Sequence, residues 1–132
     1  MAKKKQTYSD YFASTGIKDR FGTVFEGLAK SERFKKLKPA VKMFYVLCRI
    51  ESQTEKGKQC LYKHAKETGE IYGANCFVFP ATHQQEYGIQ RQNGSAYFKA
   101  LIAEGFIEVR EDNSHRHKVN VYCFSDKWKD SS

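Results

Sequence analysis

The fold of this chain is decided by residues 80–124, which read PATHQQEYGIQRQNGSAYFKALIAEGFIEVREDNSHRHKVNVYCF. A short polar helix candidate covers residues 82–87. Gly88 and Ile89 then have the form of a sharp turn, because glycine is the residue that tolerates such a corner. A second and longer helix is predicted over residues 91–104, ending before a glycine.

Two strand-like runs, residues 106–110 and 118–124, follow Gly105 and are separated by a polar loop, as in a β-hairpin. Helix, turn, helix and hairpin in this order predict a winged helix-turn-helix, the unit that lays its second helix in the major groove of DNA. We therefore expect an α+β fold, with a helix-turn-helix at about 82–104, a small antiparallel β-sheet wing at about 106–124, and an extra N-terminal segment.

The outward face of the second helix carries the side chains that we expect to read bases. Phe98 and Leu101 fall on its inner face, so Gln92, Ser95 and Lys99 project outward together. Amide side chains bind adenine and arginine binds guanine, each through paired hydrogen bonds, whereas a lysine one turn further on suits phosphate better. An ordinary polar solvent face is the alternative. The predicted base contacts are Gln90, Arg91, Gln92, Asn93 and Ser95.

Basic residues outside this face are the candidates for holding the DNA backbone. In the loop of the predicted wing, Asp112 and Asn113 are turn formers and the cations come after them. In the first half of the chain, Lys38, Lys42, Tyr45 and Arg49 line up within about 60° on one helix face, which could equally be solvated. The predicted backbone or wing contacts are Lys99, Arg110, His115, Arg116, His117, Lys118, Lys38, Lys42 and Arg49.

Two positions depart from the usual helix-turn-helix pattern. His83 stands where the first helix normally has an apolar residue, and we interpret it as a partly buried packing residue. Gly94 stands where the second helix normally has a small aliphatic residue, and glycine inside a helix costs about 1 kcal/mol relative to alanine. Gly94 either permits a close approach of the two helices, or the second helix begins only at Ser95, which is a good cap.

The first half of the chain is expected to add helices to one domain over residues 10–132, after a flexible basic arm at 1–9. A short helix at 31–37 has Ser31 as its cap, and Pro39 fits the first turn of a longer helix at 38–53. The buried stripe predicted for that longer helix is Val41, Phe44, Leu47 and Cys48.

Residues 55–75 are the least clear part of the sequence. We interpret 55–58 as a turn or loop and 61–66 as a short helix closed by Gly69. Residues 76–79 then form a short strand, which in a winged helix commonly joins the hairpin as a third strand.

The net charge of +8 favours a polyanionic partner, in the first instance nucleic acid. Its distribution is uneven, because residues 1–66 carry 16 Lys/Arg and 6 Asp/Glu, whereas residues 67–132 carry 7 and 9. The predicted reading helix therefore lies in the half with a net charge of −2, and the first half, at +10, is expected to supply much of the phosphate attraction.

The cysteines and the sequence motifs favour neither a metal site nor enzymatic activity. Cys60, His64 and Cys76 could supply metal ligands, as could His115 and His117, but close CxxC pairs are absent, so we expect reduced, buried thiols and no metal. No phosphate loop, nucleophile elbow or HExxH motif is visible, so we expect neither enzymatic activity nor a cofactor. No apolar run approaches a membrane span and no signal-peptide core follows the basic start, so we expect a cytoplasmic protein.

The run SERFKKLKPAVKMFYVL at 31–47 resembles the opening of winged helices in plasmid and phage replication initiators of Gram-positive bacteria and in related mobile-element proteins. FVFP at 77–80, YGI at 87–89 and LIAEGFI at 101–107 follow in the same order. The resemblance implies a winged helix with specific duplex DNA as its ligand. It also implies a stand-alone binder, because a further domain often follows in that group and this sequence ends at Ser132.

The leading expectation is a non-enzymatic, sequence-specific double-stranded DNA-binding protein: an accessory factor in plasmid replication or conjugative transfer, or a transcription regulator. Replication or relaxosome proteins and a homodimer are further partners that the resemblance allows. The main alternative is a winged helix that serves as a protein-interaction module in a replication or transfer complex. A third alternative, binding of single strands by the many rings, is weaker because the aromatic residues recur at core spacings.

Overall fold

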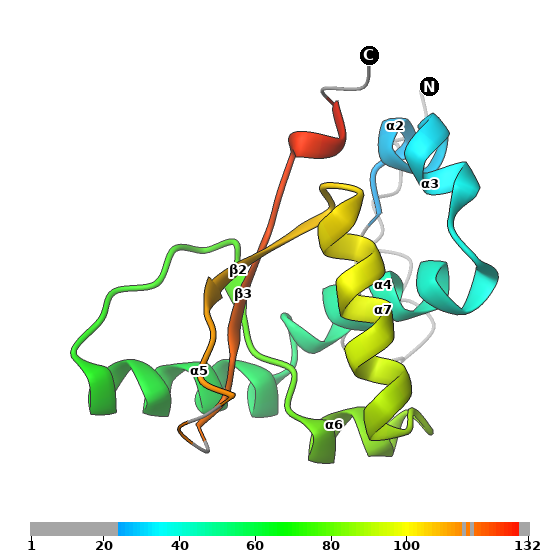
Figure 1. Cartoon of the computed structure of the whole chain (residues 1–132). Coiled ribbons are helices and arrows are strands. Elements are labelled where there is room, and N and C mark those ends of the chain that lie inside the picture. Colours follow the sequence, from blue (N-terminus) through cyan, green and yellow to red (C-terminus); the bar gives the residue numbers. More distant parts are fainter. Residues whose placement is uncertain (1–23, 115, 117, 130–132) are drawn as a thin grey trace, which may run out of the picture.

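The computed structural model describes residues 24–114, 116 and 118–129, and its fold is α+β, with helices packed against a small three-stranded antiparallel sheet (Figure 1). The predicted basic arm at residues 1–9 lies outside the described residues. No helix in the described part of the chain is long and apolar enough to cross a membrane.

The chain begins its described part with short helices whose ends the sequence predicts well. Helix α2 (Glu26–Ala29) precedes α3 (Glu32–Lys36), and the Ser31 hydroxyl accepts a hydrogen bond from Phe34 N at 3.2 Å, which confirms Ser31 as the cap. Helix α4 (Pro39–Glu51) has its proline in the first turn, where the missing N–H costs nothing.

The main core lies between α4 and helix α7 (Arg91–Ala103), and it is built from aromatic rings. The Phe44 ring centroid lies 4.8 Å from that of Phe98 and 5.5 Å from that of Phe79. Burial of a side chain of this kind contributes about 1.5–3 kcal/mol. The predicted stripe of α4 is largely confirmed, because Val41, Phe44 and Cys48 are buried and Leu47 is half-buried.

The expectation that Lys38, Lys42, Tyr45 and Arg49 form one solvent-facing row on α4 is wrong, because the Tyr45 side chain is completely buried. Its ring packs edge-on against Phe34, Phe106 and Phe124, at centroid distances of 5.9 to 6.2 Å. Helix α4 is therefore covered on two sides, by α7 on the Phe44 side and by these three rings on the Tyr45 side. A single stripe of apolar residues cannot reveal such a second covered face, because tyrosine is found both inside and outside proteins.

Helix α5 (Glu55–Thr68) corrects the interpretation of residues 55–58 as a loop. The Thr54 hydroxyl caps the helix by accepting from Gly57 N at 3.0 Å, so the glycine lies in the first turn rather than in a break. Gly69 ends α5 in the left-handed conformation, as predicted. With Thr54 as its cap, one continuous helix begins at residue 55, where Gly57 and the charged residues around it indicated a turn.

The sheet has the strand order β1-β3-β2, so the short strand β1 (Cys76–Phe77) joins the hairpin as predicted. The hairpin consists of β2 (Ile107–Glu111) and β3 (Val121–Phe124), and the second strand is shorter than expected. A register shift between Val109 and Glu111 leaves Arg110 without a partner in the ladder.

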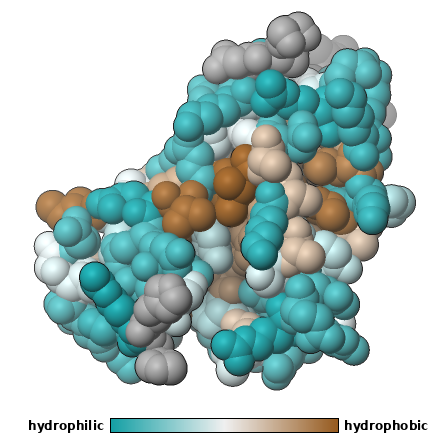
Figure 2. All heavy atoms as spheres, in the orientation of Figure 1, coloured by the Kyte–Doolittle hydropathy of each residue, from teal (hydrophilic) through white to brown (hydrophobic). Residues whose placement is uncertain are grey.

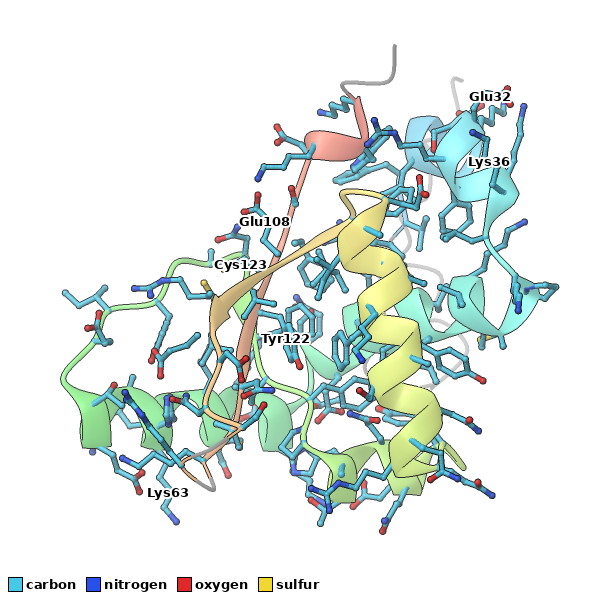
Figure 3. The ribbon with its side chains drawn as sticks, in the orientation of Figure 1. Glu32, Lys36, Lys63, Glu108, Tyr122 and Cys123 are labelled. Atoms are coloured by element: carbon cyan, nitrogen blue, oxygen red, sulfur yellow. The ribbon has the colours of Figure 1, made fainter. Side chains whose placement is uncertain are left out.

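The sheet packs on both faces, which creates two clusters of buried residues. Tyr122 points toward α7, where its ring stacks on Phe98 at 4.0 Å, and Cys123 points to the other side (Figure 3). On that second face Cys123 Sγ lies 2.7 Å from Cys76 Sγ, and both cysteines are free. Burial raises the pKa of the Cys123 thiol, and Cys76 raises it further, to about 12, so the thiol is protonated at neutral pH.

Helix α6 (Ala81–Glu86) and α7 are joined by a short turn at Gly88, whose φ of 79° is the left-handed conformation that glycine tolerates. After α7 the chain enters β2, and Phe98, Leu101 and Ile107 are buried as expected. The described chain ends with the 3-10 helix η1 (Lys127–Lys129). Its Trp128 ring stacks on the Phe106 ring at a centroid distance of 6.1 Å.

Candidate nucleic-acid interface

The N-terminal half of α7 exposes every side chain that the sequence predicts as a base contact. The helix begins at Arg91 with Gln90 as its cap, so the alternative in which it starts at Ser95 is wrong. Such a helix start also directs unpaired backbone N–H groups and the positive end of the helix dipole outward, which favours an anion. The exposed set is Gln90, Arg91, Gln92, Asn93, Ser95 and Lys99.

Gly94 lies under this exposed face and sets how closely α6 approaches α7. A Cβ atom at Gly94 would meet Gln84 Oε1 at 1.9 Å, so an unshifted Gln84 leaves no space for any larger residue. Gln84 is held in place because its Nε2 donates to Phe79 O at 2.8 Å. Of the two interpretations of Gly94, close helix approach is the one that the structure confirms.

A groove separates α7 from the hairpin and has a volume of about 630 Å³. In Figure 2 the molecule is hollowed between two largely hydrophilic lobes, with more hydrophobic atoms at the bottom of the hollow. Phe98 and Tyr122 contribute to its wall together with polar groups. The polar and charged side chains that line it are Gln84, Arg91, Ser95, Lys99, Asp112, Ser114, Lys118 and Asn120.

The groove therefore brings together cations that are far apart in the sequence. Arg91 and Lys99 come from α7, and Lys118 comes from the returning side of the hairpin. Asp112 is the acid on the same groove, and its Oδ1 accepts from Ser114 N at 3.0 Å. Three cations and one acid give this surface a positive balance although its half of the chain is net negative.

The hairpin loop is closed by a buried asparagine, which refines the prediction of a turn at this point. Asn113 is only 3% exposed, and its Nδ2 donates to Val119 O and to Glu111 Oε1, both at 2.8 Å. The Asn113 N–H also donates to Asn120 Oδ1 at 2.6 Å. This closure ends β3 pairing at Val121 and leaves Lys118 exposed, as is Arg116; His115 and His117 lie outside the described residues.

Arg110 is exposed but does not line the groove. Its Nη2 lies 3.4 Å from Glu70 Oε2, and its guanidinium lies 5.4 Å from the Tyr72 ring centroid. The structure thus places this predicted wing contact beside the segment that follows α5, on the other side of the hairpin from α7.

The predicted contacts on α4 are also separate from the groove. The Arg49 guanidinium lies 3.9 Å from the Phe124 ring centroid, and its Nε donates to the Tyr45 hydroxyl at 3.1 Å. Lys42 lies over the Phe34 ring at 5.7 Å, whereas Lys38 is exposed at the helix start. Arg49 therefore acts as a packing residue that covers aromatic rings with its cation.

Two carboxylate–histidine pairs, one buried and one partly buried, were not predicted from the sequence, and they join the parts of this candidate interface to the rest of the fold. His83 Nδ1 lies 2.5 Å from Glu51 Oε1 and joins α6 to the end of α4. His64 Nε2 lies 2.8 Å from Glu111 Oε1 and joins α5 to the hairpin. The only indication in the sequence was that His83 stands where a helix-turn-helix normally has an apolar residue, and this did not identify Glu51 or Glu111 as a partner.

The two carboxylates differ in their other partners. Tyr87 OH donates to Glu51 Oε2 at 3.3 Å, and burial followed by the Glu51 charge raises the pKa of that tyrosine. Glu111 accepts from Asn113 and from the Tyr72 hydroxyl in addition to its histidine. Burial acts to raise the pKa of Glu111, but the hydrogen bonds from Asn113 and the two rings outweigh burial and lower that pKa to about 2.

The structure also shows how two of the residues that were considered as metal ligands are arranged. His64 is engaged by Glu111, and Cys76 faces Cys123. No group of three or more His, Cys, Asp or Glu side chains within the described ranges could hold a metal ion.

Comparisons of the chain with protein-family models, with curated proteins and with solved structures find no match.

Proposed function

We propose that this chain is a winged helix-turn-helix protein that binds double-stranded DNA sequence-specifically, without catalysis, with α7 as its reading helix. The element order is α4, α5, β1, α6, α7, β2, β3. It supports the winged-helix assignment, since β1 pairs with β3 and the hairpin follows α7 directly. The hairpin then acts as the wing.

The observation that carries the proposal is the amide-rich, exposed start of α7 above a groove with a positive balance. Arg91 and Gln92 offer the donors and acceptors that read guanine and adenine edges, and both are exposed. Lys99 and Lys118, on opposite sides of the groove, suit the phosphates on either side of the bases. The aromatic rings of the described residues support duplex rather than single-strand binding, because most of them are packed in the core rather than arranged on an open platform.

The test begins with selection of bound duplexes from random DNA, followed by affinity measurements on the selected site. Arg91→Ala or Gln92→Ala should weaken the cognate site by about 1–3 kcal/mol and spare unrelated sequences, because base contacts carry specificity. Gln53→Ala is the matched control, since Gln53 is an exposed amide outside α7. Equal loss on all sequences contradicts base reading by these side chains. A palindromic selected site would indicate a symmetric dimer.

The biological setting belongs to the same proposal. The resemblance to plasmid and phage replication initiators favours a role in replication or conjugative transfer of a mobile element, or in transcription regulation. In each of these settings the chain recognises a defined duplex site.

A second candidate function, docking of a protein partner, is favoured by apolar exposure beside α5. Tyr62 is 62% exposed and Ile71 is 90% exposed. Tyr62 also lines a groove of about 500 Å³ between α5 and β1, together with Leu61, Tyr72 and Val78 among others. A salt titration separates the two functions, since DNA affinity falls steeply with salt whereas a docking module binds DNA weakly at any salt.

A further inference from the structure

Helix α5 carries a row of exposed polar side chains that the proposed reading helix does not involve. Lys56, Gln59, Lys63 and Lys66 recur at spacings of three, four and three residues, and all of them are exposed. At 100° per residue they fall within about 80° of one another and extend over about 15 Å of helix, which makes them one face. This set is called the lysine stripe below. Glu55 and Glu67 lie at its edges rather than within it.

The orientation of the lysine stripe is fixed by contacts from α5 to both parts of the proposed interface. His64 contacts Glu111 on the wing strand, and Lys56 forms an ion pair with Glu86 of α6. Residues seven apart on a helix point in nearly the same direction, so Lys63 faces the same side as Lys56 and hence the side on which α6 lies. Figure 3 shows Lys63 below α5, on the side of the molecule where α6, the hairpin loop and the start of α7 also lie.

The charges at the far end of the lysine stripe are not neutralised within the described part of the chain. Lys63 and Lys66 have no carboxylate partner among residues 24–114, 116 and 118–129, and the Lys66 amine lies 4.7 Å from the Tyr62 ring centroid. Lys58 is equally exposed, but it lines the groove on the other side of α5. The same helix therefore offers a cation on each side, of which only one faces the proposed DNA.

We propose that the lysine stripe is a second backbone-binding surface, on which Lys63 and Lys66 hold phosphates of the duplex beyond the wing. This inference rests on the proposed DNA-binding function and extends its footprint along the DNA. It also supplies the phosphate attraction from the first half of the chain that the charge distribution requires, from α5 rather than from α4. Lysine suits this role because it contacts phosphate as a point charge, without a fixed geometry.

The experiment measures the affinity of Lys63→Gln and of the double variant Lys63→Gln/Lys66→Gln for the selected duplex as a function of salt. Each lost phosphate contact should reduce the slope of log K against log salt by about 0.9, which is about fivefold in affinity at physiological salt. Lys58→Gln is the matched control, with the same charge change on the same helix, and it should bind as the original protein does. Circular dichroism of each variant confirms that the exposed substitutions leave the fold intact.

Trimming the DNA identifies where the contact lies. The effect of Lys63→Gln should disappear on a duplex shortened by about one helical turn, 10–10.5 base pairs, on the wing side. If Lys63→Gln and Lys58→Gln bind alike while Arg91→Ala loses the site, the lysine stripe has no such role and the reading helix stands. An equal loss on long and trimmed duplexes also overturns the inference. If the original protein binds no duplex at all, the proposed function itself fails.

Discussion

The two carboxylate–histidine pairs of this protein hold different junctions, and their surroundings differ accordingly. The Glu51–His83 pair joins α4 to α6, and its side chains are 4% and 10% exposed. The Glu111–His64 pair joins the β2–β3 hairpin to α5, and the Glu111 side chain is 22% exposed. The more deeply buried carboxylate, Glu51, accepts hydrogen bonds from His83 and Tyr87, whereas the more exposed Glu111 accepts from His64, Tyr72 and Asn113.

Because of this difference, we expect the two junctions to tolerate substitutions unequally. A buried charge that loses its partner is costly, so the α4–α6 junction should not tolerate removal of either member of its carboxylate–histidine pair. The hairpin junction shares its hydrogen bonds among several donors, so the loss of one donor leaves the Glu111 carboxylate still partnered. We therefore expect removal of the carboxylate to cost more stability at the first junction than at the second.

The largest effect should come from Glu51→Ala, which leaves His83 and the Tyr87 hydroxyl without their shared acceptor. Removing one partner of a buried pair costs about 3–5 kcal/mol, so the midpoint of urea unfolding should fall sharply. Glu67→Ala, at an exposed position of α5, should leave that midpoint nearly unchanged. If the two variants unfold alike, the α4–α6 pair contributes little to stability.

An intermediate and pH-dependent effect is expected for Glu111→Gln. The pKa of Glu111 is lowered from 4.5 to about 2 in the folded protein, so its charge stabilises the fold above pH 4.5. That contribution is lost as the pH falls from about 4.5 to about 2, because the unfolded state takes up the proton first. The stability difference between the two proteins, measured by urea unfolding at about pH 7, 5 and 3, should therefore shrink toward acid. A constant difference would mean that the Glu111 charge plays no part.

The smallest effects should come from a matched pair of hydroxyl deletions, one at each junction. Tyr72→Phe removes a hydrogen bond to Glu111, and Tyr87→Phe removes a long one, of 3.3 Å, to Glu51. We expect a loss of about 1 kcal/mol for Tyr72→Phe and of about half that for Tyr87→Phe, because a long hydrogen bond contributes less. Thermal unfolding of both variants measures this order, and the reverse order would show that burial outweighs bond length.

Local signals in the sequence were sufficient for the elements around α7. The turn glycine, the LIAEGFI run and the alternating strands predict α6, α7 and β2 nearly to the residue, because each depends on neighbours in the chain. Ser31 and Gly69 were predicted for the same reason.

Features that depend on distant residues were not predicted. Helical spacing predicts a solvent-facing Tyr45, because spacing within one helix does not reveal contacts with rings 60 or more residues further along the chain, such as Phe106 and Phe124. The start of α5 was not predicted, because Gly57 and the charged residues around it indicated a turn and the capping role of Thr54 was not recognised. The register shift in β2 was not predicted either, because no local sequence pattern indicates it. Of the proposed site, the exposed face of α7 was predictable, whereas the groove and the lysine stripe required the fold.

The packing of Gly94 on Gln84 has a consequence for the proposed reading of DNA by α7. The residues that hold α7 in place, Gly94, Phe98 and Leu101, are separate from those that face outward. Position 94 admits no substitution unless Gln84 moves with it, whereas Gln92, Ser95 and Lys99 are exposed and free to vary. Under the proposed function, designed variants should acquire new target sequences when the outer residues of α7 are exchanged while its inner residues and its scaffold stay the same.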